Sequence, residues 1–470
     1  MKMLSPVLKT APLDIVGSTK FGRYPKISIE QTFNMIISDK WLVPFAGYQV
    51  VSTIAPNGQG RGLYSSAQYK HMIMVIDNGV YKVNQNLGAT KIAEIATFSG
   101  DVFIDENNAG QIAICDKSKI YIFDYNNNTF QAANLDFLPG YVAFQDTYFI
   151  APDLRSSEWR LSDNNQGLTW PHDAQHTGEF QTKPNRPVAA LRFPGKGNRL
   201  FVFGSTVTEA WYDLGYQLFP YQKETDFNID YGCLNPATIA SNDNIIVWLA
   251  ANEKSGPVIM VSDGGEPKQI SNDGINFRFA QLKNPTNSYG FLFKQDGHNI
   301  YQITFPEDNF SLAYDFNTNQ FFTLTDQSMN YHIAKRVVYF NNSYFFVSFN
   351  DGNLYELNTK YTSYNGQEIP RVRVCKNIRM PDTSRFVVNE LSFTIEQGQS
   401  NDVQRVDLSL SKNGGESFGS SLGKTLNTVG HRPNRLRYWN LGAANDLVLQ
   451  FRFWGEGRFV ATDGVVSYYQ

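Results

Sequence analysis

One short pattern of apolar and polar positions recurs seven times along the chain. Two apolar or aromatic residues flank a variable residue, and Asp, Asn or Ser follows. The copies occupy residues 81–84, 121–124, 159–162, 210–213, 259–262, 312–315 and 355–358. Their last residues are therefore 40, 38, 51, 49, 53 and 43 positions apart. Asp, Asn and Ser start turns because their side chains bond nearby backbone groups. A strand that ends in such a turn every 40 to 50 residues is typical of a β-propeller blade.

Short strands fill the chain between residues 61 and 370 at the spacing that such blades require. They either alternate with period two or are apolar throughout. We predict them at residues 72–76, 111–115, 120–123, 148–151, 200–203, 245–249, 258–261, 289–293, 300–304, 337–340 and 344–349. WD-type signatures are missing. We therefore predict a degenerate β-propeller at 61–370, with about seven blades and six as the alternative count.

The two ends of the chain differ from this repeat region. Residues 1–60 are irregular and rich in proline, and only 29–40 has a weak helical pattern. We expect an extended N-terminal arm that lies along a neighbour or closes the ring. Residues 371–470 contain further strands and predict a C-terminal antiparallel β-sandwich domain. These strands are expected at 386–394, 406–411, 435–440, 446–453 and 457–467. The predicted fold class is all-β.

Composition and charge narrow the possible functions. Aromatic residues make up 14% of the 470 positions and charged residues only 18%, which suits pleated surfaces and extensive contacts. The formal net charge of −3 excludes a polycation built to grip phosphates. Three widely spaced cysteines argue against a disulfide framework. We find no signal peptide and no run of about 18 apolar residues, so no membrane span is expected.

Several motifs resemble catalytic or metal-binding sites. In each case, a role in forming a turn is the simpler explanation. Residues 411–418 and 163–170 resemble the Asp-box turn of sialidase-like propellers, which folds a hairpin and catalyses nothing. His172 and His176 could share a metal, but they lie in a loop without a third ligand at a suitable spacing.

Two further motifs receive the same interpretation. The stretch from Asp315 to Asn319 opens like a calcium loop but lacks the required glycine. Arg61 lies in a glycine-rich turn and could touch an anion, although an ordinary turn is the simpler reading. We predict no catalytic residue, no metal and no cofactor, and we do not expect an enzyme.

The C-terminal domain carries a set of arginine and tryptophan side chains. From residue 371 onward, ten Arg and three Lys face nine acidic residues, so this part has a net charge of +4 and the rest −7. The candidate subunit-interface residues are Arg432, Arg435, Arg437, Trp439, Arg452, Trp454 and Arg458. Arg and Trp are enriched at protein interfaces. Structural roles within the domain and nucleic-acid contact remain as alternatives.

The chain resembles the packaged-DNA stabilization proteins, or tail hub (nozzle) factors, of short-tailed podoviruses. The C-terminal stretches 390–398, 408–418 and 435–442 carry the strongest resemblance. Near the N-terminus, the pair Asn34-Met35 precedes the stretch 42–47, in which Phe45 and Ala46 separate the proline and glycine. The resemblance covers nearly the whole chain in order.

This resemblance implies a structural virion protein of the tail, assembled in the host cytoplasm. Such proteins form a hexameric ring below the portal and its adaptor (head completion) ring, continue the DNA channel and retain packaged DNA. They also dock tailspikes or tail fibres and a tail needle or plug. Genomic double-stranded DNA would pass through without sequence-specific binding. We therefore expect a channel wall without a dense Lys/Arg lining, because strong phosphate contacts would oppose sliding.

Two other classes of function remain open at this point. The Asp-box-like turns also suit a glycan-binding or sialidase-like propeller, which would need converging arginine and carboxylate groups in a central pocket. A receptor-binding adhesin is the second alternative, and it would more plausibly be monomeric or trimeric than hexameric.

Overall fold

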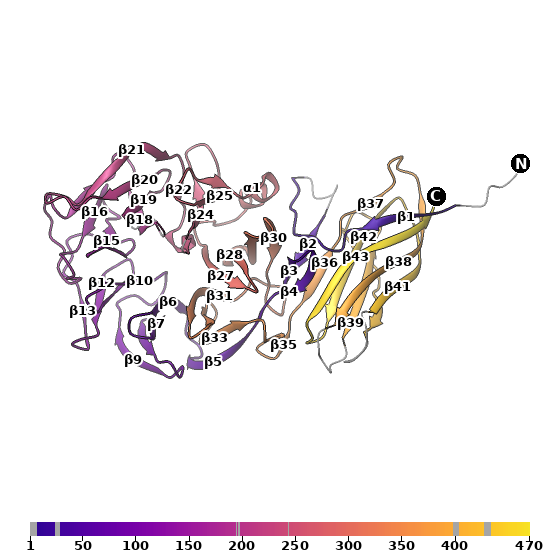
Figure 1. The fold of residues 1–470 in the computed structure, drawn as a ribbon, viewed down its shortest axis with the longest axis horizontal. Helices are drawn as coiled ribbons and strands as arrows, with labels where there is room; N and C mark the ends of the chain where they lie inside the picture. The colour runs from indigo at the N-terminus through magenta and orange to yellow at the C-terminus, as the bar shows by residue number, and fades with distance from the viewer. Residues whose placement is uncertain are drawn as a thin grey trace, which may run out of the picture.

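The computed structural model describes residues 7–23, 29–193, 195, 198–242, 244–397, 404–426 and 434–470. The molecule is elongated, with a ring of sheets at one end and a C-terminal unit at the other (Figure 1). Helices in this part of the chain are α1 (Asp273–Phe279) and the 3-10 turns η1 (Pro236–Thr238) and η2 (Pro306–Asp308). Within the same residues, no helix has the length and apolar character needed to cross a membrane.

Seven antiparallel sheets follow one another around the ring formed by the described residues. Blade 1 consists of β6 (Gly60–Ser66), β7 (His71–Ile76), β8 (Gly79–Val83) and β9 (Ala89–Glu94). Blade 2 consists of β10 (Phe103–Glu106), β11 (Gln111–Cys115), β12 (Ile120–Asp124) and β13 (Thr129–Ala132). Blade 3 consists of β14 (Ala143–Gln145), β15 (Tyr148–Pro152), β16 (Glu158–Leu161) and β17 (Thr177–Glu179). Blade 4 consists of β18 (Pro187–Arg192), β19 (Arg199–Gly204), β20 (Thr208–Asp213) and β21 (Tyr221–Ile229).

The last three blades are less regular. Blade 5 consists of β22 (Gly232–Cys233), β23 (Ala240–Ser241), β24 (Ile246–Ala251), β25 (Val258–Ser262) and β26 (Lys268–Gln269). Blade 6 consists of β27 (Tyr289–Gln295), β28 (His298–Phe305), β29 (Phe310–Asp315) and β30 (Gln320–Thr323). Blade 7 consists of β31 (Ala334–Phe340), β32 (Ser343–Ser348), β33 (Gly352–Asn358) and β5 (Gly47–Ala55), with the short hairpin of β34 (Ser363–Tyr364) and β35 (Gln367–Glu368) beside β5.

The seven-fold sequence pattern marks one structural position. Each copy lies at the end of the third strand of its blade, from β8 in blade 1 to β33 in blade 7. The Asp, Asn or Ser that follows begins the turn toward the outermost strand, as Asp124 does by accepting hydrogen bonds from two backbone amides, those of Asn126 and Asn127. The all-β propeller prediction is confirmed, with seven blades.

The outermost strand of blade 7 comes from the other end of the sequence. Strand β5 pairs antiparallel with β33, so residues 47–55 close the ring against residues 352–358. Hydrophobic clusters fill the spaces between neighbouring blades. Between blades 1 and 2, for example, Ile73 and Val75 contact the cluster that contains Ile112 and Ile114. The core of the propeller is therefore a series of layers between sheets.

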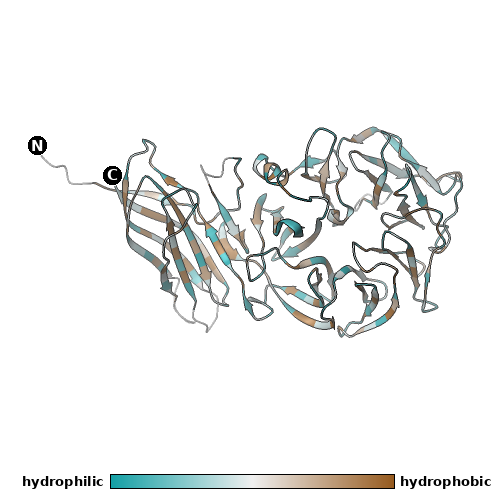
Figure 2. Ribbon diagram, turned by 180° about the vertical axis from the view of Figure 1, so that it is seen from behind, coloured by the Kyte–Doolittle hydropathy of each residue, from teal (hydrophilic) through white to brown (hydrophobic). Residues whose placement is uncertain are grey.

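The C-terminal unit consists of two sheets around one hydrophobic core. The first sheet has the order β3 (Met35–Ser38), β4 (Trp41–Pro44), β43 (Phe459–Tyr469), β38 (Phe386–Gln397) and β41 (Asn434–Ala444), and β1 (Leu8–Leu13) also pairs with β43. The second has the order β2 (Gln31–Phe33), β36 (Arg371–Val374), β42 (Asp446–Trp454), β39 (Arg405–Ser411) and β40 (Leu422–Thr425), with β37 (Ile378–Arg379) beside β42. Leu391 and Phe393 of the first sheet and Leu449 and Phe451 of the second meet in this core. Hydrophobic and hydrophilic positions alternate along these strands (Figure 2), so we interpret the unit as a β-sandwich.

One sheet runs from the propeller into the C-terminal unit. Strand β2 pairs in parallel with β30 of blade 6, through Phe33 and Thr323, and antiparallel with β36. The weak helical pattern at 29–40 was a wrong prediction, because these residues form β2 and β3. Strand β3 pairs with the adjacent β4, whereas the partners of β2, which are β30 and β36, lie about 300 residues away. Such pairing overrides a weak local preference.

Candidate functional site

Three of the candidate interface residues lie together on the outer face of the C-terminal unit. Arg435, Arg437 and Trp439 alternate along β41 and are exposed, whereas Leu436 and Tyr438 between them point into the core. Half of the Trp439 surface is accessible to solvent. Arg432, the first residue of the candidate set, lies outside the described residues.

The other candidates do not join this cluster. Arg452 and Trp454 lie on β42, in the opposite sheet, where the guanidinium stacks 3.6 Å from the indole centroid. The indole Nε1 of Trp454 donates a hydrogen bond of 2.9 Å to Asp407 Oδ2. Arg458 bonds Asp296 Oδ2, in the β27–β28 turn of blade 6, at 2.8 Å. The structure therefore divides the set into an exposed group, a self-contained stack and a contact with the propeller.

A buried polar network joins β36 of the C-terminal unit to residues 15–30, and it was not predicted from the sequence. Arg373 on β36 has no exposed surface. Its guanidinium donates to the carbonyls of Ile15 and Ser18, at 2.8 and 3.1 Å, and to Glu30 Oε1 at 2.6 Å. Burial raises the pKa of Glu30, but the charges and hydrogen bonds of Arg373 and Lys20 outweigh it and hold the pKa below its usual value.

A buried asparagine continues this network toward the propeller. Asn34, with a left-handed φ of 54° and no exposed surface, donates to Thr325 Oγ1 at 2.7 Å and to the carbonyl of Pro370 at 2.9 Å. Its Oδ1 accepts from the Thr325 amide at 2.8 Å. Asn34 was notable in the sequence only through the family resemblance. Its contacts join blade 6, the C-terminal unit and the N-terminal segment, so the junction is a rigid one.

Side chains close the axis of the propeller. Arg336 on β31 of blade 7 donates to the carbonyl of Ala237 in η1 of blade 5 at 2.7 Å. The same guanidinium lies 5.6 Å from the ring centroid of Phe103 in blade 2. Blade 7 is flanked by blades 6 and 1, so these contacts cross the centre of the ring.

Lys335, next to Arg336, also lies at the axis of the propeller. Lys335 is 3% exposed, and its Nζ lies 3.7 Å from Asp101 Oδ1. Burial lowers the pKa of Lys335 to about 8, although the Asp101 charge opposes the shift. An ionisable pair in this position holds blades 2 and 7 together across the axis.

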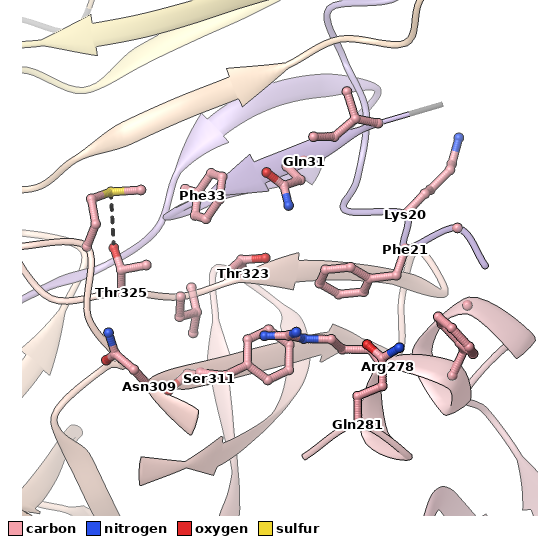
Figure 3. A pocket seen from close by; sticks show the side chains of 17 residues that line it. Lys20, Phe21, Gln31, Phe33, Arg278, Gln281, Asn309, Ser311, Thr323 and Thr325 are labelled. Atoms are coloured by element: carbon pink, nitrogen blue, oxygen red, sulfur yellow. Dashed lines mark hydrogen bonds between the residues drawn. The ribbon is translucent and has the colours of Figure 1, made fainter. Parts of the chain in front are cut away.

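A separate pocket of about 390 Å³ lies between the N-terminal segment, α1 and blade 6 (Figure 3). Phe21 meets Phe310 edge-on at 5.7 Å, and the guanidinium of Arg278 lies 5.4 Å from the Phe310 ring. Among the described lining residues, Lys20 and Arg278 carry the charges. Aromatic rings beside two cations suit a packing contact.

The motifs with possible chemistry are turn formers. In the turn after β39, Ser411 Oγ accepts from the Gly415 amide at 2.9 Å and Asn413 Oδ1 from the Ser417 amide at 3.1 Å. In the second Asp-box-like turn, Trp170 is buried and its Nε1 donates to the carbonyl of Gly167 at 2.8 Å. The interpretation of both stretches as structural turns is confirmed.

The two histidines and the calcium-like stretch, all within the described residues, also form hydrogen bonds with nearby protein groups and share no metal site. His172 pairs with Asp136 at 2.9 Å and His176 with Asp173 at 2.8 Å, so the two rings take separate partners. Asp315 accepts from the Asn317 amide at 2.9 Å, within its own turn. In the described part of the chain, no group of three or more His, Cys, Asp or Glu side chains could hold a metal ion.

Arg61 is neither flexible nor exposed, which corrects the interpretation of its segment as an ordinary turn. It lies in β6, is fully buried and donates to the carbonyls of Asp77, Thr97, Ser99 and Gly100. Anion contact is excluded because backbone oxygens already surround the guanidinium.

A family model described as "Bacteriophage P22 Gp10, beta-propeller" matches residues 22–362, which is 341 of the 470 positions. The chain belongs to this family. It is thus a structural protein of the phage tail, of the group that stabilises packaged DNA. A comparison with curated proteins finds no significant match.

Among solved structures, the chain is similar to several propellers. A streptogramin B lyase is 15% identical over 68% of this chain and 100% of its own, with a TM-score of 0.45. The N-terminal domain of Nup159 is 10% identical over 70% and 98%, with a TM-score of 0.42. The WD40 propeller domain of Doa1 is 10% identical over 66% and 96%, with a TM-score of 0.41. Similarities of this degree carry no information on function.

Proposed function

We propose that copies of this chain form a ring-shaped tail hub, or nozzle, below the portal and its adaptor ring. The ring, a hexamer, continues the DNA channel and retains the packaged genome. Membership of the P22 Gp10 family supports this proposal at the level of a phage tail protein.

The observation that carries the proposal is the closed propeller axis. Arg336 bridges from blade 7 to Ala237 in blade 5 and to Phe103 in blade 2, so a DNA duplex has no path along the axis of a single propeller. A protein of this shape contributes to a DNA conduit only as one segment of its wall. Several copies must then surround the channel, as a ring does.

The rigid junction supports the same role. A wall under pressure from packaged DNA must transmit load between neighbouring proteins without bending. The continuous sheet through β2 and the buried hydrogen bonds of Asn34 to Thr325, after β30, and to Pro370, before β36, hold the propeller and the C-terminal unit in one orientation.

The channel wall is weakly attractive to DNA. With a net charge of −3, the chain lacks the surplus of cations that phosphate binding needs. DNA therefore slides past the wall during ejection, without sequence-specific contacts. Continuous rings of Lys and Arg around the bore of the assembled particle would contradict this part of the proposal.

Surfaces that do not line the channel bind neighbouring subunits and other tail proteins. Residues 371–470, with their net charge of +4, and the N-terminal segment contact neighbouring subunits. Other faces dock the adaptor ring, tailspikes or fibres and a tail needle or plug. Interfaces of this obligate kind bury on the order of 2,000 Å² or more.

Particles assembled without the chain provide the test. We expect heads that fill with DNA and then lose it, so that nuclease degrades the genome, and purified chain added back should restore protection. Heads that retain DNA equally well with and without the chain would refute the proposal. Turnover of sialosides or host polysaccharide by the purified chain would instead favour a glycan-cleaving propeller.

A further inference from the structure

The outer face of the first C-terminal sheet combines apolar and cationic groups. Cross-strand register places Leu8, Val387 and Val465 on β1, β38 and β43, on the side of the sheet that points away from the core. These three side chains are 49%, 44% and 46% exposed. Trp439 on β41, which pairs with Glu390, adds an indole to the same side. We call this surface the β38 face.

The charges on the β38 face are mainly positive. Arg437 pairs with Ser392, which pairs with Val465, so its guanidinium lies beside the apolar groups. Arg435 is two positions further along β41, and Lys424 Nζ lies 5.6 Å from the Trp439 ring. Two carboxylates on the same side of β38 offset part of this charge: Glu390, 3.5 Å from Arg437, and the exposed Glu396. The three cations therefore exceed the carboxylates by one. Exposed apolar groups of this number, rimmed by charge, mark an interaction surface.

On the opposite sheet of the same unit, the corresponding Arg and Trp side chains are already paired within the chain. There Arg452 stacks on Trp454, which donates to Asp407, and Asp407 also accepts from Arg405 at 2.5 Å. Those polar groups satisfy one another within the chain. The β38 face is therefore the outer surface of the unit that still offers apolar and cationic groups to a partner.

A second exposed apolar group lies on the rim of blade 4. The loop between β20 and β21 exposes Leu214, Tyr216 and Leu218 by 45%, 57% and 76%. Carboxylates flank this rim loop. Burial raises the pKa of Asp213, and the nearby Asp146 charge adds to the shift. Neither carboxylate forms an ion pair within the described residues.

The two surfaces are complementary but cannot meet within one molecule. Both are apolar, and one is cationic where the other is anionic. The rim loop belongs to the propeller and the β38 face to the C-terminal unit, in different halves of the elongated molecule (Figure 1). The continuous sheet at the junction prevents the chain from folding one onto the other.

We propose that the β38 face of one copy binds the rim loop of blade 4 of a second copy. Contact between two unlike surfaces is heterologous: it repeats head to tail and closes into a ring when the rotation allows. This inference rests on the proposed function and identifies the contact that builds the ring.

Charge exchange in the full-length chain tests the contact. Arg435→Glu with Arg437→Glu, or Asp146→Lys with Asp213→Lys, should weaken self-association at least tenfold in mass photometry. The chain with all four substitutions should recover it, because each like-charge contact becomes an opposite-charge one. Failure of the combined chain to recover would overturn the inference if its melting temperature equals that of the wild type.

Lys376→Glu with Lys412→Glu is the matched control, since both lysines are exposed on the C-terminal unit and the charge change is the same. It should assemble like the wild type. An equal loss in this control would mean that net charge alone governs assembly, and would overturn the inference.

Photo-crosslinking provides a readout that does not depend on affinity. A benzophenone side chain at position 439 should crosslink to residues 213–221 of another copy, and one at Tyr339, an exposed position in blade 7, should not. Rings that crosslink elsewhere, or to an acidic partner protein alone, would overturn the inference and leave the ring intact. A chain that stays monomeric at every concentration would contradict the proposed function as well.

Discussion

Replacing Arg373 with methionine tests how much its buried contacts with residues 15–30 stabilise the fold. The substitution keeps the apolar stem but removes the guanidinium, which donates to Ile15, Ser18 and Glu30. Glu30, whose side chain is 7% exposed, would keep only Lys20, at 3.0 Å, as an ionic partner. Removing one member of a buried ion pair costs about 3–5 kcal/mol because the other charge stays buried.

Urea denaturation followed by tryptophan fluorescence measures this loss. We expect Arg373→Met to lower the free energy of unfolding by about 3–5 kcal/mol. Arg379→Met is the control, since Arg379 is 41% exposed beside Asp446 and should change stability by less than about 1 kcal/mol.

A double variant separates the ion pair from simple packing. Arg373→Met combined with Glu30→Met should recover at least half of the loss, because no unpaired charge then remains in the core. The reasoning is refuted if Arg373→Met unfolds within about 1 kcal/mol of the wild type, or if the double variant is less stable than the single one.

Three further changes probe other parts of the fold. Burial lowers the pKa of His332 to about 3, so the unfolded state binds a proton first and stability falls as the pH drops below about 6.5. The variant His332→Phe should therefore lose about 2 kcal/mol less stability than the wild type between pH 7.5 and pH 5, and an equal loss in both would contradict this account. Arg336→Met should destabilise the propeller by about 1–3 kcal/mol in the same assay, through the lost donor to Ala237, and unchanged stability would argue that the axis does not need this bridge. Gly178→Ala should lower the melting temperature, since a Cβ there would lie 2.2 Å from the Trp159 ring, and an unaltered melting curve would mean that blade 3 relaxes freely.

Local patterns predicted much of the propeller. The seven Asx-type turns identified the third strand of every blade because both the strand period and the turn chemistry are properties of neighbouring residues. Asp124 and Asp315 were recognised as turn formers for the same reason, and the structure gives both carboxylates backbone amide partners.

Long-range pairing could not be predicted in this way. Nothing near β5 indicates that it pairs with β33, about 300 residues later, and β2 had a weak helical pattern although it joins β30 to β36. The burial of polar residues could not be predicted either. Arg373 alternates with valines in a short strand, and a single sequence does not reveal whether such a side chain faces solvent or a carboxylate.

The candidate interface illustrates the same limit. Arg437 and Arg452 look equivalent in the sequence, since each is an arginine in a strand beside a tryptophan two residues away. The structure distinguishes them, because Arg452 stacks on Trp454 whereas Trp439 remains half exposed. Exposure depends on which face of which sheet a residue occupies, and that depends on pairing between distant strands.

The central claim is that copies of this chain surround a DNA channel that lies between them. Electron-microscopy class averages of the purified full-length chain test it most directly. We predict six-fold rings with a central opening, in which the seven-bladed propellers form the wall and the axis of each propeller is closed. Monomeric particles at every concentration, or an opening that coincides with the axis of a single propeller, would contradict the account.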